Sequence, residues 1–197
     1  MTDFATERNQ LRQLIRQRRQ ALTAAQQQQA ASDLVAKFVT LAAYPRMQHL
    51  ALYLSNDGEL NTQPLINMLW EQVKSVYLPI LHPFKAGFLI FQAYRPDTPM
   101  TQNKFGIAEP VLDVSQLIPL PELQLIGLPL VAFDQHANRM GMGGGFYDRT
   151  LQNVQFCRPA PLLVGLAHQC QQVPSVPTEA WDVPLQHIVT PAQIFSS

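Results

Sequence analysis

Charged residues are scarce in this sequence, and neither sign dominates. Asp, Glu, Lys and Arg make up only 14% of the 197 residues, whereas about 25% is usual in a globular domain. Fourteen basic residues balance fourteen acidic ones, so the formal net charge is zero. A protein that binds nucleic acid or anionic membranes normally carries an excess of Lys and Arg. The composition therefore argues against both kinds of partner.

Cysteines and long apolar runs are also lacking. Cys157 and Cys170 form no CxxC pair and lie near no histidine cluster, which argues against a structural zinc site and a disulfide scaffold. No run approaches the roughly 18 apolar residues that cross a bilayer. The amino-terminal residues lack the apolar segment of a secretory signal. We therefore expect a cytoplasmic protein.

The hydrophobic content and its distribution along the chain are typical of a folded domain. Hydrophobic residues make up 47% of the chain, enough for a sizeable core without a disulfide or a metal. Short apolar runs alternate with amphipathic segments, which predicts an open, mostly parallel sheet flanked by helices in a three-layer, Rossmann-like α/β architecture. No linker divides the chain, so we predict one domain over residues 1–197. The expected strands are 49–55, 75–80, 88–94, 123–133, 162–167 and 187–190, and residues 134–145 are expected to form a loop. The expected helices lie within 8–22, after a capping box of Thr23 and Gln26, over 62–73 with Thr62 as the cap, and from 146 to 154.

Arginines are concentrated near the start of the chain. Five of the fourteen basic residues are Arg8, Arg12, Arg16, Arg18 and Arg19. On a helix all of these except Arg18 share one face, which borders an apolar stripe and could lean over a cleft at the edge of the core. The pattern alone favours a solvated face or a weak RNA-binding surface. A nucleic-acid-binding module therefore stays open as an alternative.

Glycines are dense at one place only. Four of the nine are Gly141, Gly143, Gly144 and Gly145. Such a segment approaches a ligand closely, and its successive N–H groups can cradle an anion. Arg139 and Arg149 could add positive charge, and Asp148 offers an oxygen ligand for Mg²⁺. A tight turn needs only one or two glycines, so the pattern favours phosphate binding.

The glycine segment matches none of the common short motifs. It lacks the Lys and hydroxyl residue of a Walker A loop, Phe146 occupies the last glycine position of GxGxxG, and there is no GxSxG nucleophile. A glycine cradle binds many phosphates, so a sugar-phosphate or acyl-CoA enzyme is a further alternative.

The stretch FDQHANRMGMGGGFYDR at 133–149 resembles the characteristic motif of the 5-formyltetrahydrofolate cyclo-ligases, also called methenyltetrahydrofolate synthetases. Further segments are similar to those of the family and occur in the same order: RNQLR at 8–12, LSNDGELNT at 54–62, NKFGIAEP at 103–110, LPLVAFD at 128–134, GLAH at 165–168 and WDVPL at 181–185. Two positions depart from the family pattern. Arg8 stands where Lys is usual, and Gly144 where some members have Lys.

The resemblance implies an ATP- and Mg²⁺-dependent enzyme of one-carbon metabolism. In that reaction the formyl oxygen of 5-formyltetrahydrofolate is phosphorylated, and ring closure gives 5,10-methenyltetrahydrofolate, ADP and phosphate. The expected partners are the folate and ATP, and the expected state is a monomer or a weak homo-oligomer. The absence of a Ser–His–Asp or Cys–His set suits this chemistry, because no covalent protein intermediate is needed.

The resemblance also implies roles for individual residues. ATP would be bound by Arg8, Arg12, Arg139, Gly141, Met142, Gly143, Gly144, Gly145, Phe146 and Tyr147. Arg139 and Tyr147 would be catalytic, Leu54 and Glu59 would contact the folate, and Asp148 and Asp182 would hold Mg²⁺. Arg16, Arg18 and Arg19 are expected to be surface charges. Structural roles stay open for Glu59 as a solvated turn residue, Asp182 as a helix cap and Tyr147 as a core residue.

Overall fold

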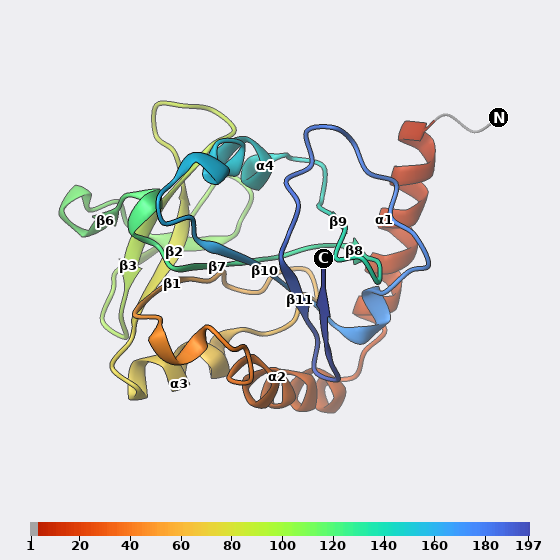
Figure 1. The fold of residues 1–197 in the computed structure, drawn as a ribbon, viewed down its shortest axis with the longest axis horizontal. Helices are drawn as coiled ribbons and strands as arrows, with labels where there is room; N and C mark the ends of the chain where they lie inside the picture. Colours follow the sequence, from red (N-terminus) through yellow and green to blue (C-terminus); the bar gives the residue numbers. More distant parts are fainter. Residues whose placement is uncertain (1–3) are drawn as a thin grey trace.

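The centre of the molecule is an eight-stranded sheet (Figure 1), seen in a computed structural model that describes residues 4–197. The strands follow the order β12-β11-β10-β7-β1-β2-β3-β6. They are β1 (His49–Ala51), β2 (Ser75–Leu81), β3 (Leu89–Tyr94), β6 (Leu117–Ile118), β7 (Leu125–Leu128), β10 (Leu162–Leu166), β11 (His187–Val189) and β12 (Ile194–Ser196). The run from β11 to β2 is parallel, while β12, β3 and β6 pair antiparallel. The predicted mostly parallel α/β sheet is confirmed.

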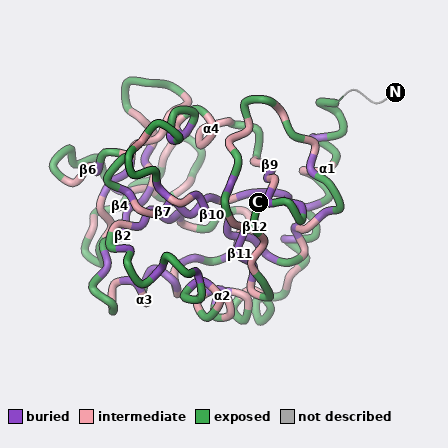
Figure 2. The backbone as a smooth tube through the Cα atoms, viewed as in Figure 1, coloured by how far each residue is buried: buried purple, intermediate pink, exposed green. Residues whose placement is uncertain are grey.

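Helices cover both faces of the sheet. In Figure 1, α2 (Ala24–Phe38) and α3 (Gln63–Glu71) lie on one face, α4 (Phe146–Leu151) lies on the other, and α1 (Phe4–Gln20) stands at one end of the sheet. Short 3-10 turns cover Tyr44–Arg46, Val114–Gln116, Leu120–Glu122, Val154–Phe156 and Gln169–Gln171. The central strands carry the most deeply buried residues (Figure 2), because parallel strands covered on both sides are apolar throughout. Within residues 4–197, no helix is long and apolar enough to cross a membrane.

The two predicted helix caps have different outcomes. Thr23 accepts a hydrogen bond from the Gln26 N–H at 3.2 Å, and its own N–H donates to Gln26 Oε1 at 2.8 Å, which completes the expected capping box of α2. Thr62 precedes α3 as predicted, but its hydroxyl donates to the Tyr53 carbonyl instead of capping the helix. That bond fastens the start of α3 to the segment that follows β1.

The predicted long strand over 123–133 is wrong in its second half. Strand β7 ends at Leu128, because Pro129 has no N–H to continue the ladder. The chain then forms a separate hairpin from β8 (Ala132–Phe133), at the end of the predicted strand, and β9 (Arg139–Met140), inside a segment expected to be a loop. A second unexpected hairpin pairs β4 (Met100–Gln102) with β5 (Ala108–Pro110). Both hairpins stand beside the site described next.

Candidate functional site

The site lies where the connections of the parallel sheet diverge. Strand β1 lies between β7 and β2, and the chain leaves β1 toward α3 on one face but leaves β7 toward α4 on the other (Figure 1). Open α/β sheets bind ligands in the crevice outside the carboxyl ends of such strands. The segment 52–59 follows β1 there, and the segment 129–131 follows β7.

Two cavities border the glycine loop, residues 141–145. The larger has a volume of about 920 Å³, and the smaller about 470 Å³. Gly141, Gly145 and Asp148 line both. Gly143 and Gly145 have φ angles of 98° and 63°, values that a side chain makes costly, so the glycines shape the wall between the cavities.

Charged and apolar side chains together line the larger cavity, and Arg8, Arg12 and Asp182 are among the charged ones. Arg8 donates from Nη1 to Asp182 Oδ2 at 3.0 Å and to the Pro177 carbonyl at 2.7 Å. Arg12 donates from Nε to the Gly141 carbonyl at 3.0 Å. Burial lowers the pKa of Arg12, and the neighbouring charge of Arg8 lowers it further. Arginines of α1 thus reach the glycine loop and the segment before β11.

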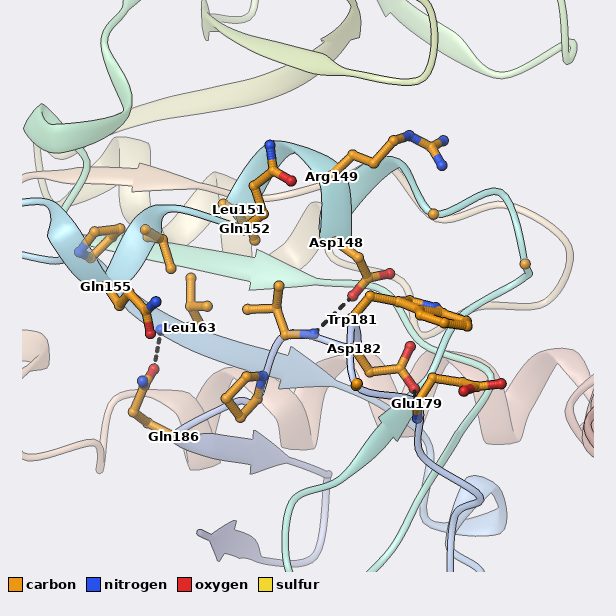
Figure 3. Close-up of a pocket in the computed structure, with 18 of the residues that line it drawn as sticks. Asp148, Arg149, Leu151, Gln152, Gln155, Leu163, Glu179, Trp181, Asp182 and Gln186 are labelled. Carbon is orange, nitrogen blue, oxygen red and sulfur yellow. Dashed lines mark hydrogen bonds between the residues drawn. The ribbon is translucent and has the colours of Figure 1, made fainter.

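The two predicted metal ligands point into this cavity from different elements (Figure 3). Asp148 Oδ1 accepts hydrogen bonds from Arg139 Nη2 at 2.5 Å and from the Val183 N–H at 3.1 Å. Its Oδ2 has no hydrogen-bond partner among residues 4–197. Both oxygens of Asp182 accept from Arg8. Residues 4–197 contain no cluster of three or more His, Cys, Asp or Glu side chains that could hold a metal ion without other ligands.

The surface of the smaller cavity is mainly apolar. Leu54 and Leu78 line it, and the ring of Phe105 meets that of Phe146 edge to face, with centroids 5.6 Å apart. Glu59 also lines it and accepts a hydrogen bond from the Asn56 N–H at 3.1 Å. Burial raises the pKa of Glu59 to about 7. A carboxyl that titrates near neutral pH inside a ligand-sized cavity is typical of a functional site.

Tyr147 and Arg139 both line the smaller cavity, close to its border with the larger one. Burial raises the pKa of Tyr147, and the nearby charge of Glu59 raises it further. The hydroxyl therefore stays protonated at neutral pH. Arg139 is buried and paired with Asp148, so one ion pair joins the smaller cavity to the larger.

Arg19 corrects the expectation that it is a surface charge. Its side chain is fully buried, and Nη2 lies 2.8 Å from Asp57 Oδ2. Arg16 donates to both oxygens of the same carboxylate, at 2.7 and 3.1 Å. The hydrogen bond from Arg16 is the main cause that lowers the pKa of Asp57. Together they tie α1 to the turn that carries Glu59, whereas Arg18 is exposed as expected.

The arginine row makes contacts within the molecule. Arg8, Arg12, Arg16 and Arg19 all make hydrogen bonds to groups distant in sequence. The interpretation of the row as a solvated face is wrong for Arg8 and Arg19, which are buried.

The structure brings the predicted site residues together around the glycine loop. Arg8, Arg12, Gly143 and Asp182 line the larger cavity; Leu54, Glu59, Arg139, Met142, Gly144, Phe146 and Tyr147 line the smaller; and Gly141, Gly145 and Asp148 line both. Several residues expected at ATP thus face the apolar side. Phe105 and Glu179, which line the smaller and larger cavities, were not singled out from the sequence.

Comparisons with known proteins agree with this geometry. The sequence profile of the 5-formyltetrahydrofolate cyclo-ligase family matches residues 5–191. The 5-formyltetrahydrofolate cyclo-ligase of Haemophilus influenzae is 54% identical over 183 residues, which are 93% of this chain and 97% of that protein. The enzyme of the same name from Escherichia coli K12 is 49% identical over 182 residues, 92% of this chain and 99% of that one.

A solved structure extends the comparison to the fold. The 5,10-methenyltetrahydrofolate synthetase of Aquifex aeolicus superimposes with a TM-score of 0.81 at 26% identity, over 96% of this chain and 92% of that one. Profile, sequence and fold converge on one family, and the resemblance of the glycine segment is confirmed. The chain belongs to the 5-formyltetrahydrofolate cyclo-ligase family.

Proposed function

We propose that this protein cyclises 5-formyltetrahydrofolate to 5,10-methenyltetrahydrofolate at the expense of ATP. The observation that carries the proposal is the pair of cavities that meet at the glycine loop, one lined by arginines and carboxylates and the other mainly apolar. A reaction that transfers phosphate from a nucleotide to a folate needs such a polar site beside an apolar one. The family membership supports the same assignment.

ATP occupies the larger cavity in this proposal. Its volume of about 920 Å³ is ample for a nucleotide, and Arg8 and Arg12 provide guanidinium groups for phosphate oxygens. Gly143 and Gly145 leave the loop backbone open to a close approach by the phosphates. Arg12 also bonds the Gly141 carbonyl, so the same side chain holds one end of the loop.

Asp148 and Asp182 are the residues that would hold Mg²⁺. Carboxylate oxygens suit this ion, and one or two of them suffice when phosphates and water complete its shell. The free Oδ2 of Asp148 is the donor that fits best, because Asp182 is paired through both oxygens with Arg8. When bound, the ion would neutralise phosphate charge during transfer.

The folate ring system occupies the smaller cavity, with Leu54 and Glu59 on its wall. The formyl oxygen then faces the glycine loop and attacks the γ-phosphorus, and the bond to the β-phosphate oxygen breaks to release ADP. Nitrogen 10 closes on the activated carbon and loses its proton. Phosphate departs with the former formyl oxygen.

Arg139 and Tyr147 stand at the border between the two cavities and orient the reacting groups in this scheme. Arg139 is held by Asp148, so its guanidinium needs little reorganisation to face developing phosphate charge. The protonated hydroxyl of Tyr147 is a hydrogen-bond donor at neutral pH. A weak nucleophile such as a formyl oxygen depends on alignment of this kind.

The test uses purified protein with 5-formyltetrahydrofolate, ATP and Mg²⁺. We expect the absorbance of the methenyl product to rise together with ADP, in equal amounts, only when all three are present. Product formation without ATP, or ADP release without the folate product, would contradict the proposal.

A further inference from the structure

Arg149 is a cation of the larger cavity that the proposed reaction has not used. It belongs to α4, and its side chain folds back along the glycine loop. Nε donates to the Gly87 carbonyl at 2.9 Å, and Nη2 donates to the Gly144 carbonyl. The guanidinium also lies 5.6 Å from the centroid of the Phe146 ring. Nη1 has no hydrogen-bond partner among residues 4–197.

Glycines make the room in which this guanidinium lies. A Cβ atom added at Gly145 would lie 2.7 Å from Arg149 Nη1, and one added at Gly87 would lie 2.6 Å from Arg149 Nε. On the same loop, a Cβ at Gly143 would lie 3.5 Å from Arg12 Cζ. Two guanidinium groups from different helices therefore flank the loop at alternate glycines.

The charges of the larger cavity separate into paired and free groups. Arg8 is paired with Asp182, and Asp148 is paired with Arg139 of the smaller cavity. Neither Arg12 nor Arg149 forms a salt bridge with a carboxylate in the part of the chain that the structure describes. The free positive charge of the cavity therefore lies at the two guanidinium groups beside the glycine loop.

We propose that Arg149 is a phosphate-binding residue of the nucleotide site, where it lies at Gly145 of the glycine loop and Arg12 lies at Gly143. Its bonds to Gly87 and Gly144 fix the guanidinium plane, and Nη1 is left to donate to a phosphate oxygen. The ligand class is a nucleoside polyphosphate, whose charge extends over more than one phosphate and so can use two separated cations. The inference rests on the proposed function, because it places ATP in the larger cavity.

The direct test measures the binding of a non-hydrolysable ATP analogue with Mg²⁺, by calorimetry and without folate. We expect Arg149→Ala to bind the analogue about tenfold to a hundredfold more weakly, the range of a lost hydrogen bond to a charged group. Arg149→Lys keeps the charge but not the planar fork and should fall in between. Arg46→Ala is the matched control, since Arg46 is exposed and lines neither cavity.

A second pair of variants displaces the guanidinium without removing it. Gly87→Ala places a methyl group against Nε, whereas Gly106→Ala has the same kind of left-handed backbone, φ 72° against 83°, with nothing within 4 Å of its new methyl. We expect weaker analogue binding in Gly87→Ala and unchanged binding in Gly106→Ala. Equal affinity in Arg149→Ala and Arg46→Ala, or no binding of the analogue by the unmodified protein, would overturn the inference.

The two proposals fail separately. If the unmodified protein binds the analogue but forms no methenyl product, the proposed reaction is wrong while the role of Arg149 still stands on the binding data. If the protein is active and Arg149→Ala binds the analogue as tightly as the unmodified chain, only the role of Arg149 is wrong.

Discussion

The two cavities accommodate their charged side chains in different ways. In the larger one, charges of both signs face one another, and three of its six charged side chains are held in ion pairs, such as Arg8 with Asp182. In the smaller one, apolar walls surround Glu59, whose pKa is raised to about 7. The comparison teaches that the first site is organised by compensation of charge and the second by desolvation. Substitutions should therefore act through different observables on the two sides of the glycine loop.

The largest effect is expected from Arg19, which holds the turn that carries Glu59 in place. Arg19→Ala leaves a cavity and removes a buried partner of Asp57, so we expect a loss of about 3–5 kcal/mol in the free energy of unfolding. Urea denaturation measures this loss. Arg18→Ala, one residue away and exposed, should change stability by less than about 0.5 kcal/mol. Similar losses in both variants would contradict the buried anchor.

Glu59 should give the smaller cavity a pH dependence of its own. The carboxyl is protonated more readily in the folded chain, with its pKa raised from 4.5 to about 7. Its stabilising contribution is therefore complete below about pH 4.5 and is lost as the pH rises through 7. At pH 8, Glu59→Gln should be more stable than the unmodified protein by up to about 3 kcal/mol, at about 1.4 kcal/mol per pKa unit. Thermal unfolding of both proteins from pH 4 to 8 tests this. A difference in stability between the two proteins that stays the same at every pH would contradict the prediction.

On the nucleotide side, Arg12→Ala should weaken ATP use by about 1.5–3 kcal/mol, the value of a hydrogen bond to a charged group. The effect should appear in the KM for ATP, because Arg12 lines only the larger cavity. The KM for 5-formyltetrahydrofolate should stay nearly constant. Steady-state kinetics with each substrate varied in turn measure the difference, and Arg18→Ala again serves as the control. An equal rise in both constants would remove the distinction between the cavities.

The smallest effect should be a shift in metal requirement. Asp148→Asn removes the charge of the carboxylate with the free oxygen, so more Mg²⁺ should be needed for half-maximal turnover, by several-fold. Asp182→Asn should act in the same direction but more weakly, since Arg8 already engages both oxygens. A Mg²⁺ titration of turnover, with circular dichroism as the folding control, measures both shifts. An unchanged requirement in a folded Asp148→Asn protein would mean that Asp148 serves only to hold Arg139.

The sequence predicted what depends on local pattern. Alternating apolar runs and amphipathic segments predicted the parallel sheet and its helices, and the Thr23–Gln26 spacing predicted a capping box that forms. The density of glycines identified the loop at which both cavities meet. Local pattern failed at Thr62, where a distant carbonyl competes for the hydroxyl, and at 129–140, where a proline ended the strand and a hairpin followed.

The candidate site depended on contacts that a sequence does not display. Nothing in the spacing of Arg19 shows that it is buried, because its partner Asp57 lies 38 residues away. The sequence also did not show that the predicted ATP residues are divided between two cavities. Neighbouring residues of one loop line different cavities: Gly143 lines the larger one, whereas Met142 and Gly144 line the smaller one. The pattern and the resemblance predicted which residues belong to the site. The contacts between these residues could be known only from the fold.

Helix α1 contacts both halves of the site. Its 17 residues extend about 25 Å at 1.5 Å per residue. Arg8 and Arg12 at the larger cavity lie on one continuous face with Arg16 and Arg19, which bond the turn that carries Glu59. One residue inserted between Arg12 and Arg16 would rotate the two halves of the helix by about 100° relative to each other. The helix could then contact one cavity or the turn beside the other but not both, so the phase of this single helix fixes the two cavities relative to each other.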